Sequence, residues 1–261
     1  MHQPVAWITG ASSGIGEAIA KNLFQKGYRL ILSARRESEL ERVKSECSNP
    51  NSIQILPLDL IEIETFEKKV KKAISFFGQI DLMIHNGGIS QRSLIKDTKL
   101  EVDRKLMEVN FFGTVALTKA LLPHFISRKS GRFVVITSLV GKFASPFRSS
   151  YAASKHALHG FFDTLRAEHY KDQLSVTLVC PGFIKTQVSV NALTEDGTPL
   201  GSMDDAQANG MSPEIFSEKL FRAIQKNKEE VYIGGKETLA VYLKRFLPGV
   251  FSKIIRKAKV R

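Results

Sequence analysis

Cysteine is scarce in this sequence, and long uncharged apolar runs are missing. The two cysteines, Cys47 and Cys180, show no metal-ligand spacing, and neither do the six histidines. We therefore expect two reduced thiols and no metal centre. No uncharged apolar run reaches about 18 residues, the length a membrane-spanning helix needs. The N-terminus also lacks the basic stretch and cleavage site of a signal peptide, which predicts a cytoplasmic location.

Positive charge is in excess, and most of it lies near the C-terminus. The chain of 261 residues has a formal net charge of +12. Residues 236–261 contribute +7 of this, because eight basic residues there face a single acid, Glu237. The asymmetry is thus a property of the tail. No recognised nucleic-acid-binding module accompanies it, so we expect no nucleic-acid partner.

Strand-like and helix-like segments alternate along the chain. The expected strands are 5–9, 29–34, 52–57, 80–84, 132–137, 174–180 and 230–233. The expected helices are 14–26, 37–46, 62–76, 100–127, 150–170 and 213–226. This alternation predicts an α/β fold in which helices cover both faces of a parallel sheet. We expect one domain over residues 1–235 and a basic extension over 236–261.

One segment, 184–211, departs from this rhythm. It contains Gly197, Pro199, Gly201 and Gly210 among acids and amides. Long irregular segments in compact domains are usually functional loops. We interpret it as a substrate loop that covers the reacting groups and excludes water.

A glycine-rich turn separates the first expected strand from the first helix. After Thr9 it presents, in order, Gly10, Ser12, Ser13, Gly14, Ile15 and Gly16. Glycine lets the backbone turn tightly and approach a pyrophosphate, whose charge meets the free N–H groups of the helix. The position of the turn directly after an apolar strand favours a dinucleotide site.

The end of the second strand indicates which dinucleotide is bound. An acid there would bind the ribose 2′-hydroxyl of NAD, but this chain has Arg35 and Arg36. A guanidinium suits a 2′-phosphate because it is planar, always charged and can donate two parallel hydrogen bonds. The two residues therefore favour NADP(H). The alternative is that they are solvated charges at the start of a helix.

Tyr151 and Lys155 stand four residues apart, so they share one face of the expected helix. Tyrosine titrates near pH 10, and a nearby ammonium favours phenolate. The pair suits acid–base chemistry near neutral pH. Such a pair is common by chance, so it needs further support.

That support is a resemblance to short-chain dehydrogenases/reductases that runs along nearly the whole chain. The family's glycine turn matches Thr9 to Gly16, and its Asn-x-Gly segment matches Asn86-Gly87-Gly88. Its helix asparagine, serine, tyrosine and lysine match Asn110, Ser138, Tyr151 and Lys155, and its Pro-Gly-x-x-x-Thr segment matches Pro181 to Thr186. The resemblance implies a doubly wound Rossmann fold with seven parallel strands in the order 3-2-1-4-5-6-7.

The resemblance also implies roles for these residues. Tyr151 would exchange a proton with the substrate oxygen, Ser138 would stabilise that oxygen, and Lys155 would hold the cofactor ribose and lower the pKa of Tyr151. Asn110 would hold a water that links Lys155 to solvent. The remaining cofactor contacts would come from Asp59 and Leu60 (adenine), Asn86 and Gly87 (adenine ribose), and Pro181, Gly182, Ile184 and Thr186 (nicotinamide side).

The expected function is NADP(H)-dependent interconversion of a ketone and a secondary alcohol, on an apolar, lipid- or steroid-like substrate. The resemblance further implies a homodimer or homotetramer packed through segments 100–127 and 150–170. The alternative is a protein that binds NADP(H) as a sensor or scaffold without turnover. The presence of all four residues Asn110, Ser138, Tyr151 and Lys155 argues against it.

The tail, residues 239–261, interleaves apolar and basic residues, and Pro248-Gly249 divides it into two short helical pieces. Apolar and basic faces on one helix are typical of a segment that lies on an anionic membrane surface. We expect peripheral attachment at the inner membrane surface. The alternative, that the apolar face packs on the protein's own core or on a second subunit, stays open.

Overall fold

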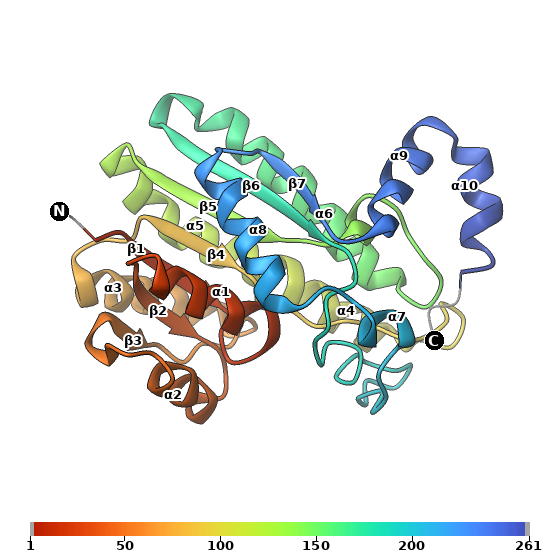
Figure 1. The fold of residues 1–261 in the computed structure, drawn as a ribbon, viewed down its shortest axis with the longest axis horizontal. Coiled ribbons are helices and arrows are strands. Elements are labelled where there is room, and N and C mark those ends of the chain that lie inside the picture. The colour runs from red at the N-terminus through yellow and green to blue at the C-terminus, as the bar shows by residue number, and fades with distance from the viewer. Residues whose placement is uncertain (1–2, 259–261) are drawn as a thin grey trace.

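A single sheet of seven parallel strands forms the centre of the computed structural model, which describes residues 3–258 (Figure 1). The strands are β1 (Val5–Thr9), β2 (Arg29–Ser33), β3 (Ile53–Ile55), β4 (Leu82–His85), β5 (Gly131–Ile136), β6 (Leu174–Pro181) and β7 (Glu230–Ile233). Their order in the sheet is β3-β2-β1-β4-β5-β6-β7. The predicted Rossmann architecture is confirmed.

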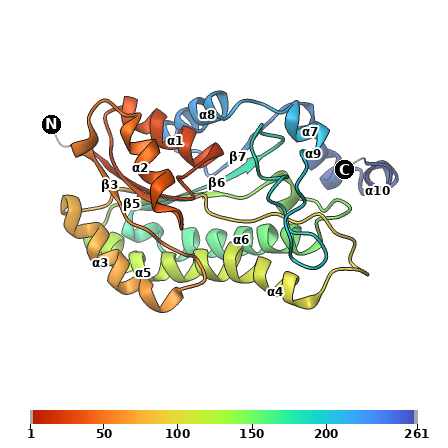
Figure 2. The same ribbon diagram turned by 90° about the horizontal axis from the view of Figure 1, so that it is seen from below.

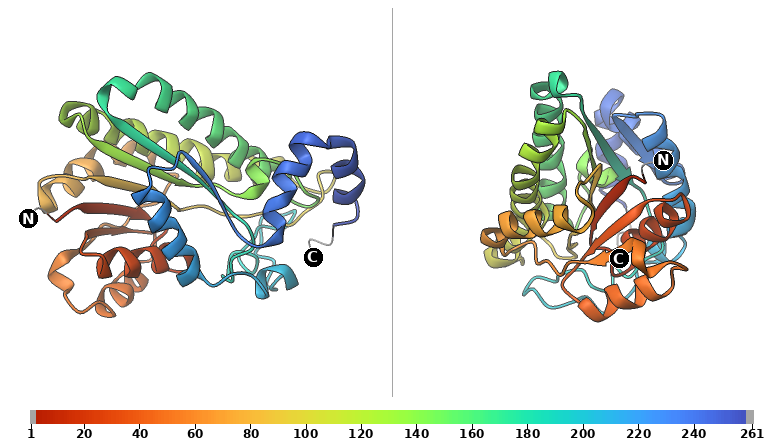
Figure 3. Two further views of the ribbon diagram at one scale, coloured as in Figure 1. Left: turned by 45° about the horizontal axis from the view of Figure 1, so that its top comes forward. Right: turned by 90° about the vertical axis from the view of Figure 1, so that its left-hand side faces the viewer.

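Helices cover both faces of this sheet (Figure 2). They are α1 (Gly14–Gln25), α2 (Glu37–Ser45), α3 (Phe66–Phe77), α4 (Leu100–Met107), α5 (Gly113–Arg128), α6 (Ser149–Glu168), α7 (Asp205–Ala208), α8 (Pro213–Gln225), α9 (Leu239–Phe246) and α10 (Pro248–Ile255). Helices α3, α5 and α6 pack in one core cluster, and α1, α2 and α8 pack in another. The right-hand view of Figure 3 shows these two layers on either side of the sheet.

The first strand shows why the sheet needs cover on both faces. All five residues of β1 are buried. Because side chains alternate along a strand, Val5 and Trp7 lie in the cluster with α3, α5 and α6, whereas Ala6 and Ile8 lie in the cluster with α1 and α8. Apolar residues on both faces are typical of a parallel sheet.

The helix expected over 100–127 is not regular throughout. Glu108–Phe112 forms a π-helical segment between α4 and α5. A π-segment holds one extra residue in a turn and is frequent at functional sites. The helix expected from residue 62 was also misplaced at its start, because Ile63–Thr65 forms a 3₁₀ turn and α3 begins at Phe66.

The third strand is shorter than expected. It lies at the edge of the sheet, where its only partner is β2. Pairing extends only over Leu30 to Leu32 of β2, opposite Ile53 to Ile55. The flanking residues of the expected 52–57 segment therefore lie outside the ladder.

Within residues 3–258, one helical run, Leu100–Arg128, has the length and composition of a membrane-spanning helix. Its side chains Leu117, Leu121 and Phe125 are buried in the core cluster on the sheet. The core helix of a compact domain has the same composition, and the packing gives this run that role.

The substrate loop, α7 and the α9–α10 hairpin gather at the end of the molecule opposite the N-terminus (Figures 1 and 3). The carboxyl ends of the parallel strands lead toward this end. In open α/β sheets, ligands bind in the crevice outside these strand ends. The fold thus predicts where the reacting groups should meet.

Candidate active site

The glycine turn after β1 has a backbone that favours glycine. Gly10 and Gly14 have φ values of 65° and 57°. A Cβ on Gly16 would lie 2.1 Å from the carbonyl oxygen of Gly10. The turn is therefore packed as tightly as a pyrophosphate cradle requires, and α1 begins at Gly14 directly after it. These residues fit the diphosphate of a dinucleotide.

Asn86 and Thr9 tie this turn to the end of β4. The Asn86 amide donates to the carbonyl oxygens of Thr9 and Gly10, both at 3.1 Å. The Thr9 hydroxyl accepts from the backbone N–H groups of Asn86 and Gly87 at 3.1 and 3.0 Å. Asn86 thus positions the turn. Its amide is committed to the backbone, which the sequence could not reveal.

The other residues expected to contact the adenine side of the cofactor follow neighbouring strands of the sheet. Arg35 and Arg36 are exposed at the end of β2, where α2 begins. Asp59 accepts a hydrogen bond from the Ile61 N–H at 3.3 Å. Leu60 is buried and packs beneath Gly87, whose added Cβ would lie 2.9 Å from the Leu60 Cδ1.

Asn110 lies in the π-segment and acts as a clamp. Its Oδ1 accepts from the Ile89 N–H at 2.8 Å, and its Nδ2 donates to the Ile89 oxygen at 2.9 Å and to Ser154 Oγ at 3.1 Å. The side chain expected to hold a water is thus bound to protein groups on both of its ends. The π-segment places Asn110 near Lys155, and Gly88 lies next to both side chains. A Cβ added to Gly88 would lie 2.9 Å from Asn110 Oδ1 and 3.7 Å from Lys155 Nζ.

Ser138, Tyr151 and Lys155 come together where β5 ends and α6 begins. Ser138 follows β5, its Oγ accepts from the Val140 N–H at 3.3 Å, and it acts on the pKa of the Tyr151 side chain. Lys155 is buried one turn along α6, and its Nζ donates to the Ile136 carbonyl at 2.9 Å. The Lys155 Nζ lies 5.7 Å from the centre of the Tyr151 ring. The structure therefore brings the three expected groups into one site.

Burial dominates the titration of this pair. It raises the pKa of Tyr151, while Arg148, the hydrogen bond from Ser138, and Arg92 oppose the rise. Burial also lowers the pKa of Lys155 to about 8. We expected Lys155 to lower the pKa of Tyr151, but burial leaves this pKa raised, and the charges that oppose the rise belong to Arg148 and Arg92.

The segment after β6 brings the substrate loop to the glycine turn. Pro181 ends β6, and Ile184 is buried beyond it. A Cβ on Gly14 would lie 3.1 Å from Thr186 Cγ2. Gly182 lies against Glu237, whose Oε1 accepts from the N–H groups of Phe183 and Gly235 at 3.0 and 2.9 Å.

We did not expect Glu237 to bind the segment after β6, at Gly182 and Phe183. The only signal in the sequence is that it is the one acid of a basic tail. Sequence reasoning also missed a buried ion cluster of Arg92, Arg148 and Asp204 beside Tyr151. These three residues are far apart in the chain, and no local pattern brings them together.

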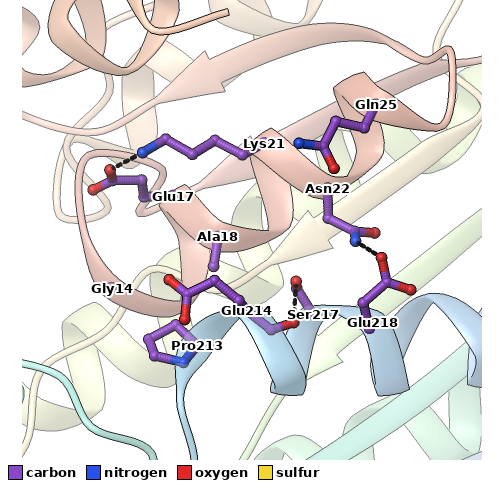
Figure 4. Close-up of a pocket in the computed structure, with 10 residues that line it drawn as sticks. All are labelled: Gly14, Glu17, Ala18, Lys21, Asn22, Gln25, Pro213, Glu214, Ser217 and Glu218. Atoms are coloured by element: carbon purple, nitrogen blue, oxygen red, sulfur yellow. Dashed lines mark hydrogen bonds and ion pairs between the residues drawn. The ribbon is translucent and has the colours of Figure 1, made fainter.

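A groove of about 390 Å³ lies between α1 and α8, and Gly14 of the glycine turn is among the residues that line it (Figure 4). Its charged side chains bind one another: Lys21 pairs with Glu17 at 2.6 Å, and the Asn22 amide donates to Glu218 at 2.5 Å. The Lys21–Glu17 pair lies within α1, whereas the Asn22–Glu218 contact joins α1 to α8, which gives the groove a structural explanation.

Comparisons with known proteins show which family the chain resembles. A family model described as short chain dehydrogenase matches residues 4–197. The Anopheles gambiae protein named dehydrogenase/reductase SDR family protein 7-like is 44% identical, over 97% of this chain and 82% of its own. The human dehydrogenase/reductase SDR family member 7 is 42% identical, over 94% of this chain and 74% of its own.

A solved structure is similar over the same span. It is an alcohol dehydrogenase from Thermococcus sibiricus complexed with 5-hydroxy-NADP, with a TM-score of 0.77 and 27% identity. The match covers 90% of this chain and 97% of that one.

Proposed function

The chain belongs to the short-chain dehydrogenase/reductase family of oxidoreductases, and we propose that it interconverts a ketone and a secondary alcohol with NADP(H). The observation that carries this proposal is the meeting of Ser138, Tyr151 and Lys155 where β5 ends and α6 begins. When bound, the nicotinamide supplies or accepts the hydride. The protein's task is then to handle one proton and the charge on one oxygen.

Three side chains divide this task. In reduction, the Tyr151 hydroxyl donates its proton to the substrate oxygen, and the Ser138 hydroxyl donates a hydrogen bond to the same oxygen. Lys155 then returns a proton to Tyr151, which its pKa of about 8 allows near neutral pH. The experiment that tests the proposal is loss of NADPH absorbance with a panel of lipophilic ketones.

An apolar substrate is supported by the surroundings of Tyr151. Its ring packs against one cluster that contains Leu139, Val140 and Phe143, and against another that contains Leu193. Leu193 belongs to the substrate loop and Leu139 follows Ser138. A lipid- or steroid-like body would be bound between such walls, because apolar pockets with few polar groups are typical of ligand sites.

We assign the preference for NADP(H) to Arg35 and Arg36. Arg35→Asp is expected to weaken NADPH binding about 10- to 100-fold more than NADH binding, because it removes a charge-assisted contact to the 2′-phosphate. Fluorescence titration of both cofactors measures this ratio, with Arg104→Asp on the exposed face of α4 as the matched control. Equal losses for NADPH and NADH would show that Arg35 does not meet the phosphate.

The α9–α10 hairpin supports peripheral attachment to an anionic membrane. Its inner residues Val241 and Phe251 are buried against the protein, and the Phe251 and Phe143 rings lie 5.3 Å apart. Its outer apolar residues are exposed: Leu239, Tyr242, Phe246, Leu247, Val250 and Ile254. The inner face packs on the protein, and we propose that the outer face contacts the membrane. Lys259 and Arg261 lie outside the described residues.

Reversing three exposed cations of this hairpin is expected to abolish binding to anionic vesicles. Each cation near such a surface is worth about 1 kcal/mol, so Arg245→Glu, Lys253→Glu and Lys257→Glu together should weaken binding at least about 100-fold. Co-sedimentation at low salt measures this. The same reversals at Lys68, Lys71 and Lys72 of α3, at the other end of the molecule, are the control (Figure 1). Equal effects of the two triple variants would count against a hairpin-specific site.

We also propose a cytoplasmic homodimer or homotetramer packed through the outer faces of α5 and α6. Phe112, which precedes α5, is exposed, and Phe111 meets Phe161 of α6 with ring centres 6.4 Å apart. An exposed aromatic beside two neighbouring helices is typical of an association surface.

A further inference from the structure

Two arginines and one aspartate form a buried cluster beside Tyr151. Arg92 is 2% exposed, Asp204 6% and Arg148 9%. They come from three separate segments: the stretch after β4, the substrate loop, and the residue before α6. Burial of charge is costly unless each group is paired and hydrogen-bonded. The partners of each charged group therefore show which charges in this cluster are closely paired.

Arg92 and Asp204 are paired closely. The Arg92 Nε and Nη2 donate to Asp204 Oδ2 at 2.8 and 2.5 Å. The Arg92 Nη1 donates to Ser90 Oγ at 2.9 Å and to the Gln91 oxygen at 2.7 Å. This ion pair fastens the substrate loop to the end of β4.

Arg148 has no comparable set of contacts. Its Nη2 lies 3.7 Å from the same Asp204 Oδ2, beyond hydrogen-bond distance. Its Nε is buried and has no hydrogen-bond partner among the residues that the structure describes. Two guanidinium groups thus lie near one carboxylate, and the Arg148 guanidinium is the less closely paired of the two. Burial and the neighbouring Arg92 lower the pKa of Arg148 to about 10, a value at which it stays charged near neutral pH.

The position of Arg148 links this charge to the reacting groups. Arg148 is the last residue before α6, three residues ahead of Tyr151, and its carbonyl accepts from the Ala152 N–H at 2.8 Å. Its guanidinium lies 5.9 Å from the centre of the Phe183 ring, on the segment that leads into the substrate loop. Both arginines act on the pKa of Tyr151. A ligand bound between Tyr151 and the loop would therefore meet Arg148.

We propose that Arg148 binds an anionic group of the substrate, a carboxylate or a phosphate monoester, while the substrate's carbonyl meets Tyr151. A buried guanidinium with an unused fork matches such groups in shape and charge. The apolar clusters around Tyr151 bind the rest of the molecule, so the substrate class is an amphiphilic keto acid or keto phosphate. This inference rests on the proposed function, but its binding step can be tested without turnover.

The test compares three ligands that share one apolar chain: octanoate, octyl phosphate and octanol. Isothermal titration is run on the NADPH-bound protein, its Arg148→Met variant and its Arg148→Lys variant. The native protein is expected to bind at least one of the two anions about 10- to 100-fold more tightly than octanol. Arg148→Met should remove this preference, and Arg148→Lys should keep part of it. Arg104→Met on exposed α4 should leave the preference as it was.

The two anions separate the sources of negative charge. A preference for octanoate alone assigns a carboxylate, and a preference for octyl phosphate alone assigns a phosphate. Equal affinity for all three ligands overturns the inference. So does an Arg148→Met variant that keeps the preference, or one that loses NADPH binding instead, since Arg148 would then serve the cofactor.

Turnover separates this inference from the proposed function. Arg148 also acts on the pKa of Tyr151, so the informative quantity is a ratio rather than a rate. The ratio of kcat/KM for a medium-chain keto acid to that for its methyl ester should fall about 10- to 100-fold in Arg148→Met. Turnover of both compounds with an unchanged ratio would contradict the anion site and leave the proposed function intact. Absence of turnover with intact anion preference would contradict the function and leave the anion site intact.

Discussion

Tyr151→Phe is expected to lower kcat/KM for ketone reduction by about 10²- to 10⁴-fold while NADPH still binds. The substitution removes only the hydroxyl that gives its proton to the substrate oxygen, and a positioned general acid contributes a factor of this size. The ring would keep its contacts with the two apolar clusters around it. Steady-state rates and NADPH titration, measured on the same preparation, separate lost chemistry from lost binding.

Tyr170→Phe is the matched control. Tyr170 is 68% exposed in the 3₁₀ turn that follows α6, and the Nζ of Lys171 lies 5.8 Å from its ring centre. The distance from the ammonium nitrogen to the ring centre is nearly the same in Tyr151 and Lys155, where it is 5.7 Å. Loss of activity in both variants, or in neither, would contradict the assignment of Tyr151 as the acid.

Lys155→Met is expected to shift the pH profile of alcohol oxidation upward by about one to three pH units. Oxidation needs the Tyr151 phenolate, so its rate rises with pH through the pKa of Tyr151, whereas reduction needs the phenol and falls through the same pKa. Burial already raises this pKa. Removal of a nearby ammonium disfavours the phenolate further, so oxidation near neutral pH should suffer most.

The comparison for this variant is Lys171→Met, which removes the ammonium of the surface pair. Its pH profile should match that of the native protein. If Lys155→Met changed the maximal rate but left the profile in place, Lys155 would serve to hold the cofactor, and Arg148 would be the principal charge acting on Tyr151.

Much of the fold could be predicted from the sequence because its strands can be recognised from their own residues. A run such as Val5–Thr9, apolar on both faces and followed by a glycine turn, allows few alternatives. The candidate site was predictable for another reason: the resemblance to the family pointed to Ser138, Tyr151 and Lys155, which stand at strand and helix ends. Residues at such ends meet whenever the parallel sheet forms.

Features that depend on tertiary contact were beyond the sequence. The π-segment around Asn110 adjusts the helix so that its amide reaches Ile89 and Ser154, and nothing in its residues marks it. The pairing of Arg92 with Asp204 spans 112 positions and depends on how the substrate loop folds back. The tail was predicted as amphipathic, but only the structure divides its apolar residues between an inner and an outer face.

The central claim is that this protein transfers hydride between NADP(H) and a carbonyl carbon. The most direct test uses NADPH that carries deuterium on the transferring face of the nicotinamide, with a panel of medium-chain ketones, keto acids and keto phosphates. Mass spectrometry of the products should place the deuterium on the carbinol carbon of at least one alcohol, and Tyr151→Phe should abolish the transfer. Tight binding of NADPH without label in any product would contradict the account and favour a protein that binds the cofactor as a sensor or scaffold.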